Sequence, residues 1–312
     1  MEDMEVKLSS WKGRRVLVTG HTGFKGSWLS LWLDRLGAHV TGLSLDPPSS
    51  PNLFTDAQVA DRLDDRRGDI RDASVVSAVI EETRPEVILH LAAQAIVRAG
   101  YTEPIETFET NVMGTAYIID AASRCSDTHA VVAVTTDKCY RNDGGSRAFI
   151  EDDPLGGDDP YSASKAAAEI VGHALRSVRT NTLIATARAG NVIGGGDWGQ
   201  DRLVPDLVRA FIAGSSTPIR NPDAIRPWQH VLDPLYGYLQ LADALLQGKV
   251  DVARGWNFGP QADDARTVRW VADESTRLWG GDAGWHHDTA EHPHEAPFLR
   301  LDASQAMKEL NW

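Results

Sequence analysis

Short apolar runs that alternate with helical segments over the first 190 residues restrict this chain to few folds. The apolar runs have the length of buried strands. They lie at 14–20, 38–45, 86–94, 129–136 and 182–190. Apolar residues at helical spacing fill the intervals, at 23–37, 74–83, 105–124 and 161–179. This alternation predicts an α/β fold with a parallel sheet and helices on both of its faces.

The alternation breaks after Gly190. A glycine-rich loop, GNVIGGGDWGQ (190–200), is followed by turns that contain proline and tryptophan, such as IRNPDAIRPWQHV (219–231). We interpret residues 191–227 plus 261–312 as a smaller, C-terminal substrate-binding domain. Residues 1–190 plus 228–260 form the predicted dinucleotide-binding domain, because the helical segment 234–248 and the strand-like GWNFGP (255–260) are expected to return to the main sheet.

Composition excludes several classes of function. The formal net charge of the 312 residues is −13, which argues against a nucleic-acid binder with a basic face. Two cysteines, Cys125 and Cys139, are too few for a secreted disulfide framework. The first ten residues lack the apolar run of a signal peptide, and no segment has the length and apolarity of a membrane span. We therefore expect a cytoplasmic protein that binds neither nucleic acid nor membranes.

The loop TGHTGFKG (19–26) joins the first strand to the first helix and has the spacing G-x-x-G-x-x-G. Its first glycine allows the turn, its second lets a pyrophosphate approach the backbone, and its third lets helix and strand pack closely. A purely structural tight turn is the alternative. The predicted cofactor contacts in this loop are Gly20, Thr22, Gly23, Phe24, Lys25 and Gly26.

The end of the second strand does not settle the choice between NAD and NADP. An acidic residue there usually holds the ribose of NAD, but the position falls at Ser44, and Asp46 lies two residues on. Asp69 and Ile70 are candidates for adenine contact. An acid that caps a helix, followed by a core isoleucine, is nearly as good an interpretation of this pair.

Small residues end the strand at HLAAQ (90–94), where Leu91, Ala92 and Ala93 would let a cofactor lie close to the backbone. Plain core packing is the alternative. Asn111 lies inside a predicted helix, where asparagine has poor propensity. It either orders a water or the backbone of the active site, or it faces solvent.

Two further motifs carry candidate chemistry. In YSASK (161–165), Tyr161 and Lys165 lie four residues apart on one helix face, and a nearby ammonium favours tyrosinate, a usable base. The alternative is an exposed helix start with an incidental lysine. Thr136, Asp137 and Lys138 directly follow a buried strand, where a solvated loop is the alternative.

Taken together, TGHTGFKG, HLAAQ, TNVMGT, TTDKCY and YSASK resemble the extended short-chain dehydrogenase/reductases that act on nucleotide sugars. Longer strings, including RAGNVIGGGDW, IRNPDAIRPWQHV and HPHEA, are similar to the CDP-glucose 4,6-dehydratase branch of that family from about Trp11 onward. The resemblance implies a Rossmann-type, doubly wound domain that binds NAD, a small domain for CDP-glucose or a related nucleotide sugar, and a homodimer through helices that include 161–178. Members typically continue into a further C-terminal helix.

The resemblance also implies catalytic roles. Tyr161 takes the proton of the sugar 4-hydroxyl, the resulting ketone acidifies C5–H, and water leaves across C5 and C6. Thr136 binds the 4-oxygen, Lys165 assists Tyr161, and Asp137 supplies a proton to the leaving hydroxyl. Lys138 stands where dTDP-glucose dehydratases carry glutamate, and three roles are open to it: base at C5, orientation of water, or holding Asp137 by charge.

Arginine suits the diphosphate of the substrate because its planar fork gives two parallel hydrogen bonds. Arg226 is favoured for this role and Arg202 comes next, with a structural ion pair as the alternative for either. The spacing of the histidines in 286–295 fits no familiar zinc site, so no metal is predicted. The predicted substrate contacts are Gln94, Arg98, Asn191, Arg202, Arg226, His230 and His294.

Two rival functions remain on the sequence alone. A nucleotide-sugar epimerase or decarboxylase would share the fold but would not need the acid Asp137. A non-catalytic, dinucleotide-sensing protein would not need the set of Thr136, Tyr161 and Lys165.

Overall fold

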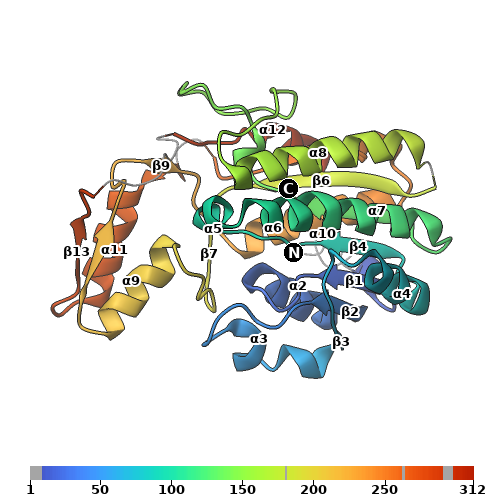
Figure 1. Ribbon diagram of the computed structural model, residues 1–312, viewed down its shortest axis with the longest axis horizontal. Coiled ribbons are helices and arrows are strands. Elements are labelled where there is room, and N and C mark those ends of the chain that lie inside the picture. The colour runs from blue at the N-terminus through green and yellow to red at the C-terminus, as the bar shows by residue number, and fades with distance from the viewer. Residues whose placement is uncertain (1–8, 180, 262–263, 291–297) are drawn as a thin grey trace.

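The computed structural model describes residues 9–179, 181–261, 264–290 and 298–312 (Figure 1). Its centre is a seven-stranded sheet in the order β11-β6-β5-β4-β1-β2-β3, and every neighbouring pair is parallel. The strands are β1 (Arg15–Thr19), β2 (His39–Ser44), β3 (Asp64–Arg67), β4 (Val87–His90), β5 (Ala130–Val134), β6 (Leu183–Ala189) and β11 (Gly255–Phe258). The chain winds outward from β1 in one direction and then from β4 in the other. The predicted Rossmann-type, doubly wound parallel sheet is therefore confirmed.

Helices cover both faces of this sheet because side chains alternate along each strand. On β1, Val16 and Val18 belong to one buried cluster and Leu17 to the other. The first cluster lies under α2 (Phe24–Arg35) and α10 (Leu232–Leu246), and the second under α4 (Ala73–Thr83) and α7 (Gly114–Arg124). The long helix α8 (Pro160–Val178) packs beside α7 and against β6. Each fully buried aliphatic side chain stabilises this arrangement by about 1.5–3 kcal/mol.

The helix predicted at 105–124 is divided in the structure. It consists of α6 (Pro104–Phe108), a π-helical turn η3 (Glu109–Met113) and α7, and α5 (Val97–Thr102) precedes it. Single π turns within α-helices are frequent at functional sites. The remaining short helical elements are η1 (Ser9–Trp11), α3 (Leu53–Asp56), η2 (Val59–Arg62), η4 (Asp137–Cys139) and η5 (Val250–Val252).

A smaller unit lies to the left of the sheet in Figure 1. It contains α9 (Leu203–Ile212), β8 (Ser216–Ile219), α11 (Val268–Trp279) and β13 (Gly284–His287), around a core of Leu207, Phe211, Ile219 and Ala272. Short strand pairs join it to the large sheet. They are β7 (Val192–Ile193) with β10 (Gln229–His230), and β9 (Ile225–Arg226) with β12 (Arg266–Thr267).

The predicted division at 190, 227 and 260 stays a prediction, and the packing adds one fact to it. Helix α12 (Ser304–Glu309) contacts β11, and Ala306 and Leu310 belong to the core of the large sheet. The end of the predicted second domain therefore packs on the first. Across the described part of the chain, no helix combines the length and apolarity that crossing a membrane requires.

Candidate active site

The glycine loop closes on itself at the carboxyl end of β1. Gly20 has a φ of +78°, and a Cβ there would lie 2.7 Å from the amide nitrogen of Ala92. A Cβ on Gly26 would lie 2.0 Å from the carbonyl oxygen of Gly20. Neither position tolerates a side chain, since the turn, strand β4 and helix α2 meet there.

This loop fits the pyrophosphate of a dinucleotide. Gly23 is the N-cap residue of the twelve-residue helix α2, and as a glycine it leaves the start of the helix uncovered by a side chain. Backbone N–H groups and the positive end of the helix dipole point toward this position. Phe24, the first helical residue, packs against the core of the large sheet. The residues present can therefore hold the phosphates of such a cofactor.

Lys25 is directed toward the predicted catalytic residues. Its Nζ donates a hydrogen bond to the Tyr238 hydroxyl at 2.9 Å and lies 5.1 Å from the centre of that ring. Burial, together with the nearby charges of Lys165 and Arg202, lowers the pKa of Lys25 to about 7, although the charge of Asp137 acts to raise it. Lys25 therefore belongs to the same electrostatic site as these three residues.

The predicted cofactor contacts at the ends of β2 and β3 are Ser44 and Asp69. Ser44 is the last residue of β2, and its hydroxyl lies 2.8 Å from that of Thr22. Asp46 is exposed, 3.8 Å from Arg67. Asp69 binds the side chain of Arg71 at 2.6 Å, and the helix cap predicted at Asp69 lies at Asp72 instead, because the helix begins at residue 73.

Ile70 packs in the core beneath the cofactor-binding edge. It is 4% exposed, and a Cβ on Gly114 would lie 2.5 Å from its Cδ1. Its contact with adenine stays a prediction.

The residues after β4 support the glycine loop. The amides of Leu91 and Ala92 donate to the carbonyl and hydroxyl oxygens of Thr19, at 3.1 and 3.2 Å. Ala93 follows them and is half-buried. The absence of a Cβ on Gly20 is what lets this backbone lie so close to it.

Asn111 does not face solvent, because it is 1% exposed. Its Oδ1 accepts a hydrogen bond from the Gln94 amide at 2.9 Å, and its Nδ2 donates to Ser164 Oγ at 2.8 Å. It lies in the π turn η3. Asn111 therefore ties the backbone after β4 to α8, the helix that carries Tyr161 and Lys165.

Three predicted catalytic residues interact with one another. Thr136 Oγ1 donates to Asp137 Oδ1 at 3.0 Å, and the Thr136 side chain also acts on that of Tyr161. Burial raises the pKa of Tyr161 to about 12, and the Thr136 side chain and the Arg202 charge oppose this effect. The phenol and the carboxyl group therefore stand on either side of one threonine hydroxyl.

The side chain of Lys165 reaches the end of strand β5. Its Nζ donates to the carbonyl oxygen of Val134 at 3.1 Å, and its assistance to Tyr161 stays a prediction. Burial lowers the pKa of Lys165 to about 8, and the charge of Glu169 raises it. The ammonium thus supports the end of β5 in this structure.

Asp137 is buried, which rules out a solvated loop at this position. It is 3% exposed, and its Oδ2 has no hydrogen-bond partner among the described residues. Burial raises the pKa of Asp137, and the charges of Lys138 and Arg226 act against this rise. Lys138 itself is half-buried. A carboxyl group in such a setting retains its proton more readily than an exposed one.

Gly190 leaves the space beside Asp137. A Cβ there would lie 2.9 Å from Asp137 Oδ2 and 2.4 Å from Cγ of Pro227. The position directly follows β6, and a side chain there would collide with Asp137 and Pro227.

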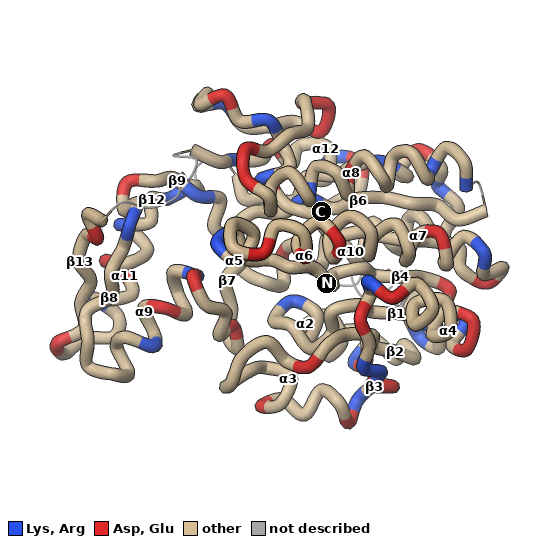
Figure 2. The backbone as a smooth tube through the Cα atoms, in the orientation of Figure 1, with Lys and Arg blue, Asp and Glu red and all other residues tan. Residues whose placement is uncertain are grey.

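Two arginines predicted to bind substrate lie near these groups. Arg226 is 5% exposed, and its charge acts on Asp137. The charge of Arg202 acts on Tyr161 and Lys25, although its Nη1 also donates to Asp197 Oδ1 at 2.8 Å. Figure 2 shows lysine and arginine at β9 and β12, where the smaller unit joins the large sheet.

The other predicted substrate contacts are more dispersed. Arg98 donates to Asp201 at 3.1 Å, and Gln94 donates to Thr107 at 2.9 Å. The backbone oxygen of Asn191 accepts from the Gln229 amide at 3.0 Å. His230 is exposed, with its ring 6.5 Å from that of Trp28. His294 lies outside the described residues.

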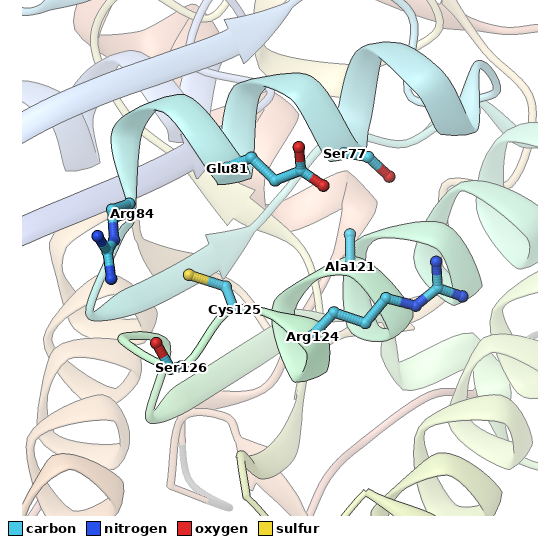
Figure 3. A pocket seen from close by; sticks show the side chains of 7 residues that line it. All are labelled: Ser77, Glu81, Arg84, Ala121, Arg124, Cys125 and Ser126. Carbon is cyan, nitrogen blue, oxygen red and sulfur yellow. The ribbon is translucent and has the colours of Figure 1, made fainter.

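A surface pocket of about 240 Å³ between α4 and α7 is not this site (Figure 3). None of the predicted catalytic, cofactor or substrate residues lines it. Its lining residues are Ser77, Glu81, Arg84, Ala121, Arg124, Cys125 and Ser126.

Sequence reasoning missed four residues that shape the site: Tyr238, Gly190, Glu169 and Arg188. Tyr238 is the partner of Lys25, and Gly190 makes room for Asp137. Glu169 follows Lys165 by one helical turn, so a carboxylate on the catalytic helix face was a usable signal. Arg188 lies in a buried strand, where an unexplained charge was another.

In sequence and in fold, the chain is similar to enzymes that act on nucleotide sugars. The sequence pattern of the family described as GDP-mannose 4,6 dehydratase matches residues 17–312. The chain is 48% identical over 310 residues to a CDP-glucose 4,6-dehydratase of Salmonella typhimurium, covering 97% of this chain and 86% of that protein. A dTDP-glucose 4,6-dehydratase from Streptomyces venezuelae, solved with NAD and TYD bound, is 25% identical with a TM-score of 0.79, covering 95% of this chain and 90% of that one. A UDP-glucose 4-epimerase from Thermotoga maritima, 20% identical with a TM-score of 0.81 and covering 96% and 93%, shares the fold.

Proposed function

The chain belongs to the GDP-mannose 4,6-dehydratase family, and from this premise we propose that it converts CDP-glucose to CDP-4-keto-6-deoxyglucose with NAD as cofactor. It is thus an NAD-dependent hydro-lyase. The observation that carries the proposal is that Thr136 interacts with both Tyr161 and Asp137, so that a phenol and a buried carboxyl group belong to one site. Oxidation at C4 needs a base, and elimination of the 6-hydroxyl needs an acid.

The residues that hold NAD are those of the glycine loop, with the backbone after β4 behind them. When bound there, NAD would supply a hydride acceptor for C4 of the sugar and a hydride donor for C6. Tyr161 takes the proton of the 4-hydroxyl, and Thr136 binds the same oxygen. The 4-ketone therefore forms beside the side-chain hydroxyls of Tyr161 and Thr136. Lys165 holds the carbonyl of Val134 and so fixes the strand end that leads to Thr136.

Elimination uses the next two residues of the chain. The ketone acidifies C5–H, and Lys138 is the side chain proposed to take that proton. The C5–H electrons form the C5–C6 double bond as the 6-hydroxyl leaves, and Asp137 gives it the proton that makes water. Burial of Asp137 raises its pKa and so favours the protonated form that this step needs. Lys138 then returns its proton to C5 as C6 takes back the hydride, and the 4-oxygen stays a ketone in the product. The proton that Tyr161 took from the 4-hydroxyl passes by way of solvent to Asp137, which restores both groups.

Arg226 and Arg202 bind the diphosphate of the substrate in this proposal. The charge of Arg226 acts on Asp137 and that of Arg202 acts on Tyr161, which supports this role. Their forks match phosphate oxygens.

A homodimer is also proposed, through α6, η3 and α8. Ile105, Met113 and Ile170 are 70%, 44% and 57% exposed on these elements, which pack together. Large apolar side chains gathered on neighbouring helices favour burial against a second copy. A cytoplasmic location is proposed too, supported by the free thiols of Cys125 and Cys139.

The test is a mass spectrum of CDP-glucose after incubation with the protein and a catalytic amount of NAD, beside dTDP-glucose and UDP-glucose. We expect loss of one water from CDP-glucose alone, with no net accumulation of reduced cofactor. The Tyr161→Phe variant should lose the activity. Water loss from another nucleotide sugar would keep the reaction and overturn the choice of substrate. An unchanged mass, or only an isomer of equal mass, would overturn the dehydratase proposal.

A further inference from the structure

A buried ion pair that the proposed mechanism does not use packs against the catalytic segment, residues 135–140. Glu169 on α8 and Arg188 on β6 are 3% and 5% exposed, and Arg188 Nη2 donates to Glu169 Oε2 at 2.7 Å. Although burial acts to raise it, the charge and hydrogen bonds of Arg188 keep the pKa of Glu169 below its ordinary value. Taking two charges out of water seldom adds stability compared with apolar packing, so the pair needs another explanation.

Glu169 holds the beginning of the segment. The hydroxyl of Thr135 donates to Glu169 Oε1 at 2.5 Å, and the Thr135 amide donates to the carbonyl oxygen of Ala187 at 2.8 Å. One turn earlier on the same helix, Lys165 holds the carbonyl of Val134. Helix α8 therefore fixes two successive residues immediately before Thr136–Asp137–Lys138.

Arg188 holds the end of the segment. Its Nη1 donates to the Tyr140 hydroxyl at 2.6 Å, and its guanidinium lies 5.0 Å from the centre of the Tyr140 ring. Tyr140 in turn donates to Asn257 Oδ1 on β11 at 2.7 Å. Tyr140 directly follows η4, so one ion pair reaches both ends of the short turn that contains Asp137 and Lys138.

We infer that Glu169 and Arg188 are positioning residues for the dehydration step: they clamp Thr135 and Tyr140 and thereby set where Asp137 and Lys138 stand against C5 and C6 of the sugar. The inference rests on the proposed function. Oxidation at C4 depends chiefly on Tyr161, which lies on α8 and therefore outside the catalytic segment. Loosening the clamp should therefore slow elimination more than oxidation.

Two threonines give a matched pair of variants. Thr135 and Thr186 both donate a hydroxyl hydrogen bond to Glu169, at 2.5 and 2.6 Å, and both are buried. Only Thr135 belongs to the catalytic segment, because Thr186 lies on β6. Thr135→Val and Thr186→Val each remove one hydroxyl from the same carboxylate at nearly constant volume, so they should destabilise the fold by similar amounts.

The experiment follows one turnover of CDP-glucose on each NAD-loaded variant and on the wild type. Absorbance of reduced nicotinamide gives the rate of oxidation at C4, quenched mass spectra give the rate of water loss, and thermal unfolding gives stability. In Thr135→Val we expect water loss to slow by about tenfold or more, with oxidation within about twofold of wild type. In Thr186→Val the ratio of the two rates should stay that of the wild type.

Tyr140→Phe tests the other end of the clamp, and it keeps the inference testable if Thr135→Val does not fold. It should slow water loss selectively as well. Equal slowing of both steps in the Thr135 and Tyr140 variants, or unchanged water loss, would overturn the inference while leaving the proposed function intact. A wild-type protein that releases no water would overturn the proposed function, and the inference with it.

Discussion

Lys165 Nζ donates a hydrogen bond to the carbonyl oxygen of Val134 at 3.1 Å, which ties helix α8 to the last residue of strand β5. Tyr161 lies one turn earlier on α8, and Thr136 lies two residues after Val134. The two motifs that sequence reasoning treated separately are therefore parts of one unit. Thr136 completes it, because its hydroxyl donates to Asp137 and its side chain acts on that of Tyr161.

Replacing Asp137 with asparagine should separate the two chemical steps. Asparagine keeps the shape and the contact with Thr136 but cannot give a proton to the leaving hydroxyl. We expect formation of the dehydrated sugar to fall by about 10²–10⁴-fold, while addition of CDP-glucose still produces reduced nicotinamide. Absorbance and mass spectra measure the two effects. Water loss at the wild-type rate would show that Asp137 is not the acid.

The role of Lys138 is tested with two variants that separate the effect of its positive charge from the effect of its basicity. Lys138→Ala removes both, whereas Lys138→Arg keeps a positive charge beside Asp137 and cannot act as a base. If Lys138 takes the C5 proton, both variants should lose deuterium exchange at C5 in heavy water and turnover with it. Retention of activity in the arginine variant alone would assign Lys138 to holding Asp137 by charge. Intact exchange in Lys138→Ala would exclude it as the base.

Gly190→Ala should reduce activity because the added methyl group would occupy the space beside Asp137. The added methyl group would lie 2.4 Å from Pro227 Cγ and 2.9 Å from Asp137 Oδ2, so one of them must move. We expect at least a tenfold loss of turnover and a destabilisation of about 1–3 kcal/mol. Gly195→Ala is the control, because a Cβ there meets no atom within 4 Å among the described residues. Equal effects of both changes would contradict the explanation.

Stability should depend on pH through Lys25. Burial lowers its pKa in the folded protein from 10.5 to about 7. Between pH 7 and pH 10.5 the unfolded chain therefore binds more protons, and stability rises with pH across this window. Below pH 7 both states are protonated and the penalty of burying the ammonium is complete.

The comparison of Lys25→Met with the wild type isolates this effect. The loss of the Tyr238 hydrogen bond is common to both pH values and cancels in the comparison. We expect the free energy of unfolding of the variant, relative to wild type, to be higher at pH 6 than at pH 9 by about 2–3 kcal/mol. Urea unfolding without cofactor measures it. A difference that does not change with pH would mean that Lys25 titrates normally.

The proposed dimer predicts a position-specific effect of surface charge. Ile105→Glu places a carboxylate on α6 within the proposed interface and should yield monomers in size-exclusion chromatography with light scattering. Ile212→Glu, on α9 of the smaller unit, is the control, since Ile212 is 65% exposed and Ile105 is 70%. Dimers that persist in Ile105→Glu and dissociate in Ile212→Glu would move the interface to the smaller unit.

Much of the fold followed from local patterns. Apolar runs and helical spacing predicted five strands of the large sheet close to their observed bounds, because these patterns depend on near neighbours in the chain. The same reasoning did not resolve α9, β8, α11 and β13, whose small core of Leu207, Phe211, Ile219 and Ala272 forms only when segments distant in sequence pack together. It also treated 105–124 as one helix and did not predict the π turn, in which Asn111 bonds to Gln94 and Ser164.

By itself, the sequence determined the parallel sheet, the glycine turn and the motifs that carry Thr136, Asp137, Tyr161 and Lys165, since each is written in adjacent residues. Tertiary structure alone decided how these groups are held. The contact of Thr135 with Glu169 spans 34 residues, and that of Tyr140 with Arg188 spans 48. Burial, which raises the pKa of Asp137 and lowers that of Lys25, likewise exists only after the chain has removed these groups from water.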